Sequence, residues 1–322
     1  MSRMSQTVSK FESKGRRRWL ICNIIVIAVV PLILSIAIKG FAQVIEFRFN
    51  PPDGITYVET LKTTKVKDMG SLGKQTDVGE NKTRVSIKKT PNGYSVVATP
   101  ISTTLTRNGE KIESPMTALL QDTVVTYDLD ADGKLLAIHG YDTIMKRALE
   151  TAPPEMAQSL SSIFNEKLLV NKETAHWNSR IGDFIGRKAK VGDAWTSTKE
   201  SEVPTGGTAL SYSATKIVAQ VKCGEHDCVQ VQFGYTSDAN ALKNVDKFLT
   251  DVFKAAGVGK EMPGISATEI VGGGERLIDP ATMLIYSETG TQTLKMQMEV
   301  PGQGKLMVTM QEKKEYTFDY PH

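Results

Sequence analysis

Cys223, His226 and Cys228 form the densest group of side chains in the sequence that could bind a metal or react. The two cysteines enclose the four residues Gly-Glu-His-Asp between two runs rich in Val and Gln, which predicts a β-hairpin whose closing pair lies at disulfide distance. In an oxidising compartment we expect Cys223 and Cys228 to form a disulfide, which stabilises so short a loop by about 2 kcal/mol. The alternative is a soft-metal site, although the sequence has no second cluster to complete four ligands.

A second candidate is a calcium loop. Asp128, Asp130, Asp132 and Gly133 have the spacing of the first six positions of an EF-hand loop, where alternate oxygens surround the ion. The twelfth position is His139, which cannot replace the bidentate Glu, and the flanking runs have strand character. Asp-Ala-Asp-Gly is also typical of a hairpin turn, and we favour that interpretation over a weak cation site.

No motif of a known reaction is present. The sequence contains neither a GxSxG nor an HExxH pattern, and residues 70–74 lack the spacing of a phosphate-binding loop. The histidines are scattered without ligand spacing: His139, His176, His226 and His322. We therefore expect a protein that is not an enzyme and that uses no cofactor and no metal, with a hydrolase of unrecognised motif as a less favoured alternative.

Methionines alternate with polar residues near the C-terminus. The alternation predicts a hairpin around a turn at residues 301–304, with an apolar inner face formed by Leu294, Met296, Met298, Val300, Leu306, Val308 and Met310. One interpretation is a core face covered by a helix. The other is that Met296, Met298 and Met310 line an adaptable groove, because flexible thioethers accept apolar ligands of irregular shape.

Residues 241–256 predict the amphipathic helix that would cover such a face. Their apolar stripe consists of Leu242, Val245, Phe248, Leu249, Val252, Phe253 and Ala256. Asn240 is suited to cap the helix at its start, and Gly257 is suited to end it. We expect Phe248 and Val252 to contact an apolar ligand held between this helix and the sheet.

Alternating β-branched and charged residues dominate the rest of the chain after residue 43. The pattern predicts long strands at 55–67, 83–89, 94–107 and 123–129, with turns at Asn92-Gly93 and Asn108-Gly109. A first β-rich half at 43–140, a helical insert at 141–189 and a second β-rich half at 190–322 follow from these patterns. The predicted class is α+β, with one or more long, curved, half-barrel-like antiparallel sheets packed with amphipathic helices.

The N-terminus determines the expected compartment. Residues 19–38 are apolar over about 20 positions, enough to cross a membrane, and Arg16, Arg17 and Arg18 precede them. We expect a basic cytoplasmic tail at 1–18 and a transmembrane anchor or signal segment at 19–39, so that the inner membrane is a partner through residues 19–38. The protein would then be a single-pass inner-membrane protein with a periplasmic body.

The leader could also be removed. Gly40-Phe41-Ala42 would serve as a cleavage site for an ordinary secretory signal, and Arg16-Arg17-Arg18-Trp19-Leu20 is similar to a twin-arginine signal. Cleavage would release the body into the periplasm. All three alternatives place the body outside the cytoplasm.

The net charge of +3 comes from the leader. Residues 1–42 contain seven Lys or Arg and one Glu, so the rest of the chain carries 32 basic and 35 acidic residues. A body with that balance offers no basic stripe with interleaved aromatic residues, so we do not expect a nucleic acid as a partner.

Two short motifs carry a resemblance. With Val-Gly-Asp-Ala-Trp at 191–195 and the acidic turn at 279–284, the chain resembles a family of uncharacterised exported bacterial proteins rich in long antiparallel strands. The resemblance implies an architecture similar to the curved half-barrels of periplasmic lipoprotein carriers, in which helices fill the concave side and a lipid chain can replace them. No lipobox follows the leader, so the chain does not resemble a lipoprotein itself, and the resemblance transfers no catalytic residue.

These observations lead to one expected function and one alternative. We expect a non-enzymatic envelope protein that binds an apolar ligand, such as a lipid or acyl chain, between the curved sheet and its helices. The alternative is a structural or scaffold module of an envelope complex, with a protein partner bound at a sheet edge or at the helical insert.

Overall fold

The expected α+β class is wrong. The computed structural model describes residues 43–113, 121, 123–151, 166–202, 208–237, 264–300 and 304–321. These residues are mostly β-strand, and their α-helical segments are α2 (Tyr141–Thr151) and α4 (Glu166–Trp177). Long antiparallel strands, not helices, make up most of this part of the chain, and α4 has no continuous apolar stripe. The strands also extend into polar stretches that the sequence pattern left unassigned.

The first β-rich half forms a meander from the centre of a twelve-stranded sheet to one edge. Its strands are β2 (Thr56–Asp68), β3 (Lys74–Thr90), β4 (Gly93–Arg107), β6 (Val125–Leu129) and β7 (Leu135–His139). The 3₁₀ turn η1 (Gly70–Leu72) separates β2 from β3, and the short strand β5 (Glu110–Lys111) pairs with the end of β4. Asn108 and Gly109 both have positive φ at the β4–β5 turn, which confirms the predicted primed turn there.

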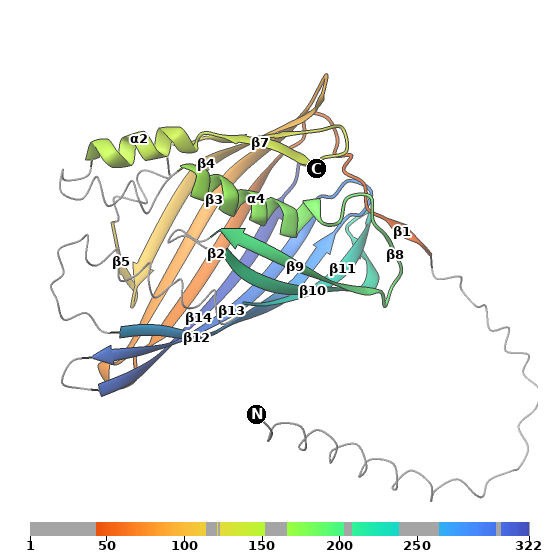
Figure 1. Cartoon of the computed structure of the whole chain (residues 1–322). Coiled ribbons are helices and arrows are strands. Elements are labelled where there is room, and N and C mark those ends of the chain that lie inside the picture. Colours follow the sequence, from red (N-terminus) through yellow and green to blue (C-terminus); the bar gives the residue numbers. More distant parts are fainter. Residues whose placement is uncertain are drawn as a thin grey trace, which may run out of the picture. The chain divides into compact units, whose positions relative to one another are not determined.

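The second β-rich half starts at the opposite edge and returns to the centre. Its strands are β9 (Ala194–Glu202), β10 (Thr208–Cys223), β11 (His226–Ser237), β12 (Gly264–Ile278), β13 (Ile285–Val300) and β14 (Gly304–Asp319). β14 pairs antiparallel with β2, so the last long strand lies beside the first one. Both β-rich halves therefore belong to one continuous antiparallel sheet (Figure 1).

The helical segment between the halves lies against one face of this sheet, which we call the inner face (Figure 1). The chain passes from α4 into a turn of π-helix, η2 (Asn178–Gly182). Trp177, the last residue of α4, stacks on Tyr127 of β6 with 5.7 Å between ring centroids. Phe184, just after η2, meets Trp195 of β9 edge-on at 5.7 Å. The α4–η2 segment therefore contacts strands near both edges of the sheet.

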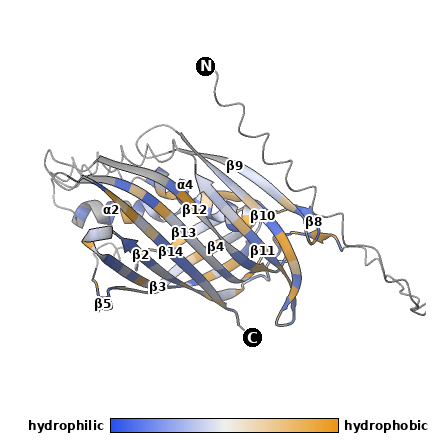
Figure 2. Cartoon of the chain, turned by 90° about the horizontal axis from the view of Figure 1, so that it is seen from below, coloured by the Kyte–Doolittle hydropathy of each residue, from blue (hydrophilic) through white to orange (hydrophobic). Residues whose placement is uncertain are grey.

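Near the main core the strands alternate as the sequence predicts, with apolar residues on the inner face and polar residues on the outer face. Further along the strands the inner face also carries polar residues such as Asp77, Ser213 and Gln292. Figure 2 shows the resulting alternation of hydrophilic and hydrophobic residues along the strands. On the outer face, Gln230 and Gln232 of β11 donate hydrogen bonds to Glu275 of β12 at 3.1 and 2.9 Å. Such polar pairs keep the outer face hydrated.

Glycines of β12 allow two aromatic rings to lie on the inner face. In the register of β11 and β12, Phe233 is opposite Gly274 and Tyr235 is opposite Gly272. A Cβ added at Gly272 would collide with the Tyr235 ring, and one added at Gly274 would collide with the Thr289 carbonyl oxygen and approach the Phe233 ring to 2.9 Å. The absence of side chains on β12 is therefore what gives the two rings their space.

The main core fills one end of the inner face. There the two-stranded sheet of β1 (Ile45–Glu46) and β8 (Lys188–Ala189) brings the N-terminal residues of the body against the main sheet. Fully or almost fully buried residues in this core include Phe47, Phe49, Leu129, Ile217, Val229, Val231, Ile278 and Met283. This core fixes one end of the α4–η2 segment.

Two predicted segments lie outside the described residues: the apolar leader at 19–38 and the helix at 241–256. Among the residues that the structure does describe, no helix is both long enough and apolar enough to span a bilayer.

Candidate functional site

Two cavities lie between the inner face and the α4–η2 segment. Cavity 1 has a volume of about 390 Å³ and is bounded mainly by the first β-rich half and α2. Cavity 2 has a volume of about 410 Å³ and is bounded by β9 to β14. Among the described residues, His176 and Arg180 are the two side chains that border both cavities, so the C-terminal part of the helical segment separates one cavity from the other.

The wall of cavity 1 is largely apolar. Its aliphatic and aromatic lining includes Leu61, Val85, Val96, Val125, Ile144, Ile181, Ile285, Phe318 and Trp177. These residues come from β2, β3, β4, β6, α2, η2, β13 and β14 and from the end of α4. A volume of this size with a mainly apolar wall and a few polar groups is typical of a small-molecule site.

Two polar groups stand out in the apolar wall of cavity 1. The Tyr127 hydroxyl donates a hydrogen bond to Glu173 Oε2 at 3.3 Å. Burial, followed by the charge of Glu173, raises the pKa of Tyr127, so this phenol remains protonated. The indole Nε1 of Trp177 is buried and finds no hydrogen-bond partner among the described residues.

A buried group of four charged residues joins the α4–η2 segment to the sheet. We call Glu59, Arg180, Arg276 and Glu288 the ionic cluster. Arg276 Nε and Arg180 Nε both donate to Glu288 Oε2, at 2.9 and 3.0 Å. Arg180 also pairs with Glu59 of β2 at 3.2 Å. Arg276 and Glu288 are only 3% and 7% exposed, so the charges neutralise one another away from water.

Arg276 also holds the backbone of η2. Its Nη1 donates to the carbonyl oxygens of Ser179 and Arg180, at 3.2 and 2.9 Å. One guanidinium of β12 thus satisfies carbonyl groups at the end of the helical segment that the helix itself leaves unpaired. The α4–η2 segment is therefore fastened to the sheet by both side-chain and backbone contacts.

The pKa shifts of Glu288 and Arg180 favour their charged forms, whereas burial lowers the pKa of Arg276. Burial alone would raise the pKa of Glu288, but Arg180 and Arg276 overcome this effect and lower the pKa to about 2. Burial would lower the pKa of Arg180, yet Glu59 and Glu288 raise it above its usual range. Glu288 is therefore ionised at every physiological pH.

His176 lies between the two cavities as a neutral ring. Its Nε2 accepts a hydrogen bond from Arg180 Nη1 at 3.4 Å. Desolvation by the surrounding protein, followed by the positive charge of Arg180, lowers the pKa of His176 to about 3, although part of the residue is exposed. The ring bordering both cavities therefore carries no charge at physiological pH.

The wall of cavity 2 carries hydroxyl, amide and charged groups beside its apolar residues. Hydroxyl and amide groups on it belong to Ser179, Ser197, Ser211, Ser213, Thr215, Tyr235, Thr291, Gln292 and Tyr316. The hydroxyls of Ser197 and Ser213 lie 2.7 Å apart in a cross-strand pair of β9 and β10. Arg187 stacks over the Trp195 ring with 4.4 Å to its centroid. Cavity 2 thus combines hydrogen-bonding groups with a guanidinium at one side.

Of the predicted ligand-binding residues, Met296 and Met310 have described side chains, and neither lines cavity 1 or cavity 2. Met296 is opposite Val308, and Met310 is opposite Leu294, so the predicted hairpin of β13 and β14 is confirmed. Met296 and Met310 are half-buried, and both lie nearer the turn between β13 and β14 than Glu288 of the ionic cluster does. Met298 belongs to β13, where its register partner is Leu306. Phe248 and Val252 lie outside the described residues, so the predicted groove stays a prediction.

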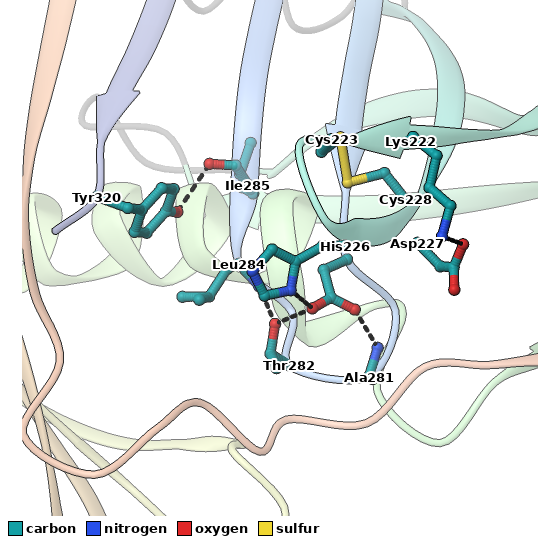
Figure 3. Close-up of a disulfide and its surroundings, with 11 residues drawn as sticks. Lys222, Cys223, His226, Asp227, Cys228, Ala281, Thr282, Leu284, Ile285 and Tyr320 are labelled. Carbon is teal, nitrogen blue, oxygen red and sulfur yellow. Dashed lines mark hydrogen bonds and ion pairs between the residues drawn. A yellow bond between two sulfur atoms is a disulfide. The ribbon is translucent and has the colours of Figure 1, made fainter. Parts of the chain in front are cut away.

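The predicted disulfide is confirmed. Cys223 and Cys228 are bonded, with 5.8 Å between their Cα atoms, and close the turn between β10 and β11 (Figure 3). His226 at this turn faces the acidic turn before β13, with Nδ1 3.8 Å from Asp279 Oδ2. Because both sulfur atoms are bonded to each other, the thiolates of the alternative soft-metal site are not available.

The candidate calcium loop is a hairpin turn between β6 and β7. Asp130 Oδ1 accepts hydrogen bonds from the backbone amides of Asp132 and Lys134, at 3.0 and 2.8 Å. Asp128 Oδ2 lies 2.9 Å from His139 Nε2 across the two strands. These carboxylates serve the turn itself, as the hairpin interpretation predicts.

The two resemblance motifs are also structural. Asp193 Oδ2 accepts the amide of Lys190 at 2.8 Å, and the amide of Gly192 donates to the Ile217 carbonyl at 2.9 Å, which ties the chain before β9 to β10. Asp279 caps its own turn by accepting from the Ala281 amide and the Thr282 hydroxyl, each at 2.8 Å. Both motifs therefore stabilise turns at the end of the sheet where the main core lies.

Comparisons with known proteins give no family. No protein-family model matches the chain. No curated protein sequence matches it. The resemblance to an exported bacterial family therefore stays a prediction.

Solved structures give weak similarities. A lipovitellin structure on lipid-protein interactions is 10% identical, with a TM-score of 0.42, and the match covers 84% of this chain and 25% of that chain. This chain thus spans about a quarter of the lipovitellin chain. DynF from the dynemicin biosynthesis pathway of Micromonospora chersina is 9% identical, with a TM-score of 0.18 and coverage of 85% and 84%.

A protein of Bacteroides fragilis, described as exported and with a YmcC-like fold, is 11% identical, with a TM-score of 0.22 and coverage of 83% and 97%. None of these scores reaches the level at which a structural likeness supports an assignment. The function is therefore argued from the cavities.

Proposed function

We propose that this protein is a non-enzymatic binder of an apolar or amphiphilic ligand, and that an acyl chain of the ligand occupies cavity 1. The observation that carries the proposal is cavity 1 itself, a volume of about 390 Å³ with a largely aliphatic and aromatic wall. Filling such a cavity with a hydrocarbon chain removes apolar surface from water, and this burial stabilises the complex by about 25 cal/mol per Å². A polar ligand would gain little from the same wall.

The attachment of the helical segment supports binding in a preformed site. Arg180 and Arg276 hold the α4–η2 segment to the sheet through Glu288 and through backbone carbonyls. Because the segment is held by buried charges rather than by apolar packing alone, the space beside it is maintained without a ligand. Preformed sites lose less conformational entropy on binding.

The disulfide supports an extracytoplasmic location for this function. Disulfides persist in oxidising compartments and are rare in the cytosol. The Cys223–Cys228 bond is therefore consistent with a body delivered outside the cytoplasm, where apolar ligands need carriers or receptors.

The test is binding of a fluorescent long-chain fatty acid to delipidated full-length protein. Ala98 lines cavity 1 on β4, and Ala98→Phe fills part of the volume. We expect this variant to bind at least about tenfold more weakly than the wild type, a loss of about 1.4 kcal/mol.

The matched control is Thr104→Phe. Thr104 is exposed on the outer face of the same strand, opposite Glu80 of β3. This variant should bind as the wild type does. If the wild type binds no probe, or if Ala98→Phe binds as tightly as Thr104→Phe, the proposal is wrong and a scaffold role explains the fold better.

A further inference from the structure

We infer that cavity 2 binds the anionic head group, a carboxylate or a phosphate, of the amphiphile whose chain occupies cavity 1. This inference rests on the proposed function and names the class of its ligand. It is carried by the distribution of charge and hydrogen-bonding groups on the walls of the two cavities.

The charges of the ionic cluster cancel one another. Arg180 and Arg276 face two carboxylates, Glu59 and Glu288, at distances of 2.9 to 3.2 Å. These four charges neutralise one another, so the cluster holds the helical segment without attracting an ion from solvent. The charge that recognises a ligand must come from other residues.

The cationic groups that line cavity 2 outnumber the carboxylates that line it, among the described residues. Lys314 of cavity 2 and Lys65 beside it share one carboxylate, Glu312, each at 3.4 Å. Arg187 contacts the Trp195 ring and the backbone carbonyl oxygen of Asp183, and no carboxylate contacts it among the described residues.

Among the described residues that line cavity 2, the cations are Arg180, Arg187, Arg276 and Lys314, and the carboxylates are Asp183, Glu288 and Glu312. Four cations therefore stand against three anions, which leaves an excess of one positive charge on this part of the wall. That charge complements a carboxylate or a phosphate.

Uncharged hydrogen-bond donors also lie on the wall of cavity 2. In strand register, Ser197 is paired with Ser213, Ser213 with Tyr235, and Gln292 with Glu312, so hydroxyl and amide groups form a row across the inner face. An anionic head group needs several N–H or O–H donors to replace its hydration. This row provides them beside Lys314 and Arg187.

The charges of cavity 1 indicate which end of the ligand lies in which cavity. The charged groups among the described residues that line cavity 1 are balanced, with Lys82 and Arg180 against Glu59 and Glu173, so an anion gains no excess positive charge there. His176 and Arg180 border both cavities, so the two parts of one ligand would meet at these two side chains. The anionic end of the ligand therefore belongs in cavity 2 and the chain in cavity 1.

The first experiment compares binding of a long-chain fatty acid, the fatty alcohol of the same length and a lysophosphatidic acid to delipidated full-length protein. We expect the two anions to bind about tenfold more tightly than the alcohol. Arg187→Gln and Lys314→Gln should each weaken binding of the anions and leave binding of the alcohol unchanged. The tighter anion identifies carboxylate or phosphate as the natural head group.

The matched control is Lys313→Gln on the outer face of the same strand, where Lys313 pairs with Glu315 at 2.8 Å. It should leave all three affinities unchanged. Equal affinity for acid and alcohol overturns this inference while the proposed function stands. Failure of every probe to bind overturns both.

A second experiment measures orientation with the protein's own tryptophans. Trp177 lines cavity 1 and Trp195 lines cavity 2. Two variants, Trp195→Phe and Trp177→Phe, each also carry Trp19→Phe, because the chain has a third tryptophan in its leader. With Trp195→Phe in this background, a fatty acid with a quenching nitroxide near its methyl end should reduce the remaining fluorescence more than one labelled near its carboxylate. With Trp177→Phe in this background the order should be reversed. The opposite pattern in both variants contradicts the proposed direction.

Discussion

Glu288 is the centre of the ionic cluster, because its carboxylate accepts hydrogen bonds from both Arg180 and Arg276. Replacing it by Gln keeps the volume but leaves Arg276 buried without a countercharge. Breaking a buried pair by removing one partner costs about 3 to 5 kcal/mol. We expect Glu288→Gln to lower the free energy of unfolding in urea by that amount.

The control for this substitution is Glu315→Gln. Glu315 pairs with Lys313 on the outer face of β14, and both side chains are about half-exposed. An exposed pair contributes about 1 kcal/mol or less. A Glu288→Gln variant as stable as Glu315→Gln would show that the cluster does not fasten the helical segment.

The same residue predicts a pH dependence. The pKa of Glu288 is lowered from 4.5 to about 2, so its folded state binds a proton less readily than its unfolded state. The stabilisation by Glu288 is complete above pH 4.5 and is lost as the pH falls toward about 2. In urea titrations, the stabilities of the wild type and Glu288→Gln should differ at pH 6 and converge near pH 2. A difference that stays constant over this range would contradict the assignment.

At the scale of single residues, the sequence contained a sign of the ionic cluster that composition and motif searches missed. Glu59 follows Tyr57 and precedes Leu61 in the two-residue period of β2, so it lies in phase with apolar residues of the inner face. Its partner Arg180 is 121 residues away along the chain. A charged residue among the apolar positions of a strand indicates that a partner of opposite charge lies buried beside it. The local sequence does not identify that partner.

Among the elements, β12 contains glycines at which an added side chain would collide with its neighbours. Gly274→Ala would place a Cβ against the Thr289 carbonyl and near the Phe233 ring. Overpacking of this kind costs about 1 to 3 kcal/mol. We expect a loss of this size in the free energy of unfolding, measured by denaturant titration.

Gly79→Ala on β3 is the matched control. Its added Cβ would meet the Thr104 carbonyl oxygen at 3.6 Å, an ordinary contact. In a strand, alanine also restricts the unfolded chain more than glycine does. Equal destabilisation by the two substitutions would argue against the role of the glycines under the aromatic rings.

The hairpin of β10 and β11 gives a redox prediction. The disulfide closes a short loop, so the double variant Cys223→Ser, Cys228→Ser should lose about 2 kcal/mol of stability. Reducing the wild type with a thiol reagent should produce the same loss in the same titration. If reduction leaves the stability unchanged, the bond does not constrain the unfolded chain.

Strands and hairpin turns were the elements that the sequence predicted best. The turn at Asn108 and Gly109 and the hairpin of β13 and β14 follow from local residue types. The N-terminal part of β3 did not follow, because Asp77 points to the inner face and pairs there with Arg107 of β4 at 2.9 Å. Local polarity resembled a loop, since both faces of the strand carry polar groups at this point.

For the whole molecule, the pairing of β2 with β14 predicts a single cooperative unfolding transition. Strands from the two β-rich halves are hydrogen-bonded over most of the length of β2, and the ionic cluster links η2 to both halves. Calorimetric and van't Hoff enthalpies should therefore agree for the body. Two separated transitions would show that the halves fold as independent units.

The sequence did not reveal that the two halves form one sheet. Each hairpin is specified by neighbouring residues, whereas the β2–β14 register joins Thr60 to Thr317, with the rest of the sheet between them in sequence. Such a pairing leaves no local pattern. The cavities were missed for the same reason, because their walls are assembled from strands of both halves and from the helical segment.

Because β14 pairs with β2, the sheet cannot close its centre until β14 has been synthesised. β2 is synthesised before the other long strands of the described sheet, yet its neighbour β14 is synthesised after all of them, so one edge of β2 stays unpaired until the rest of this sheet exists. An unpaired strand edge recruits other chains and promotes aggregation. Shielding this edge by a chaperone until β14 is synthesised should therefore raise the yield of correctly folded protein.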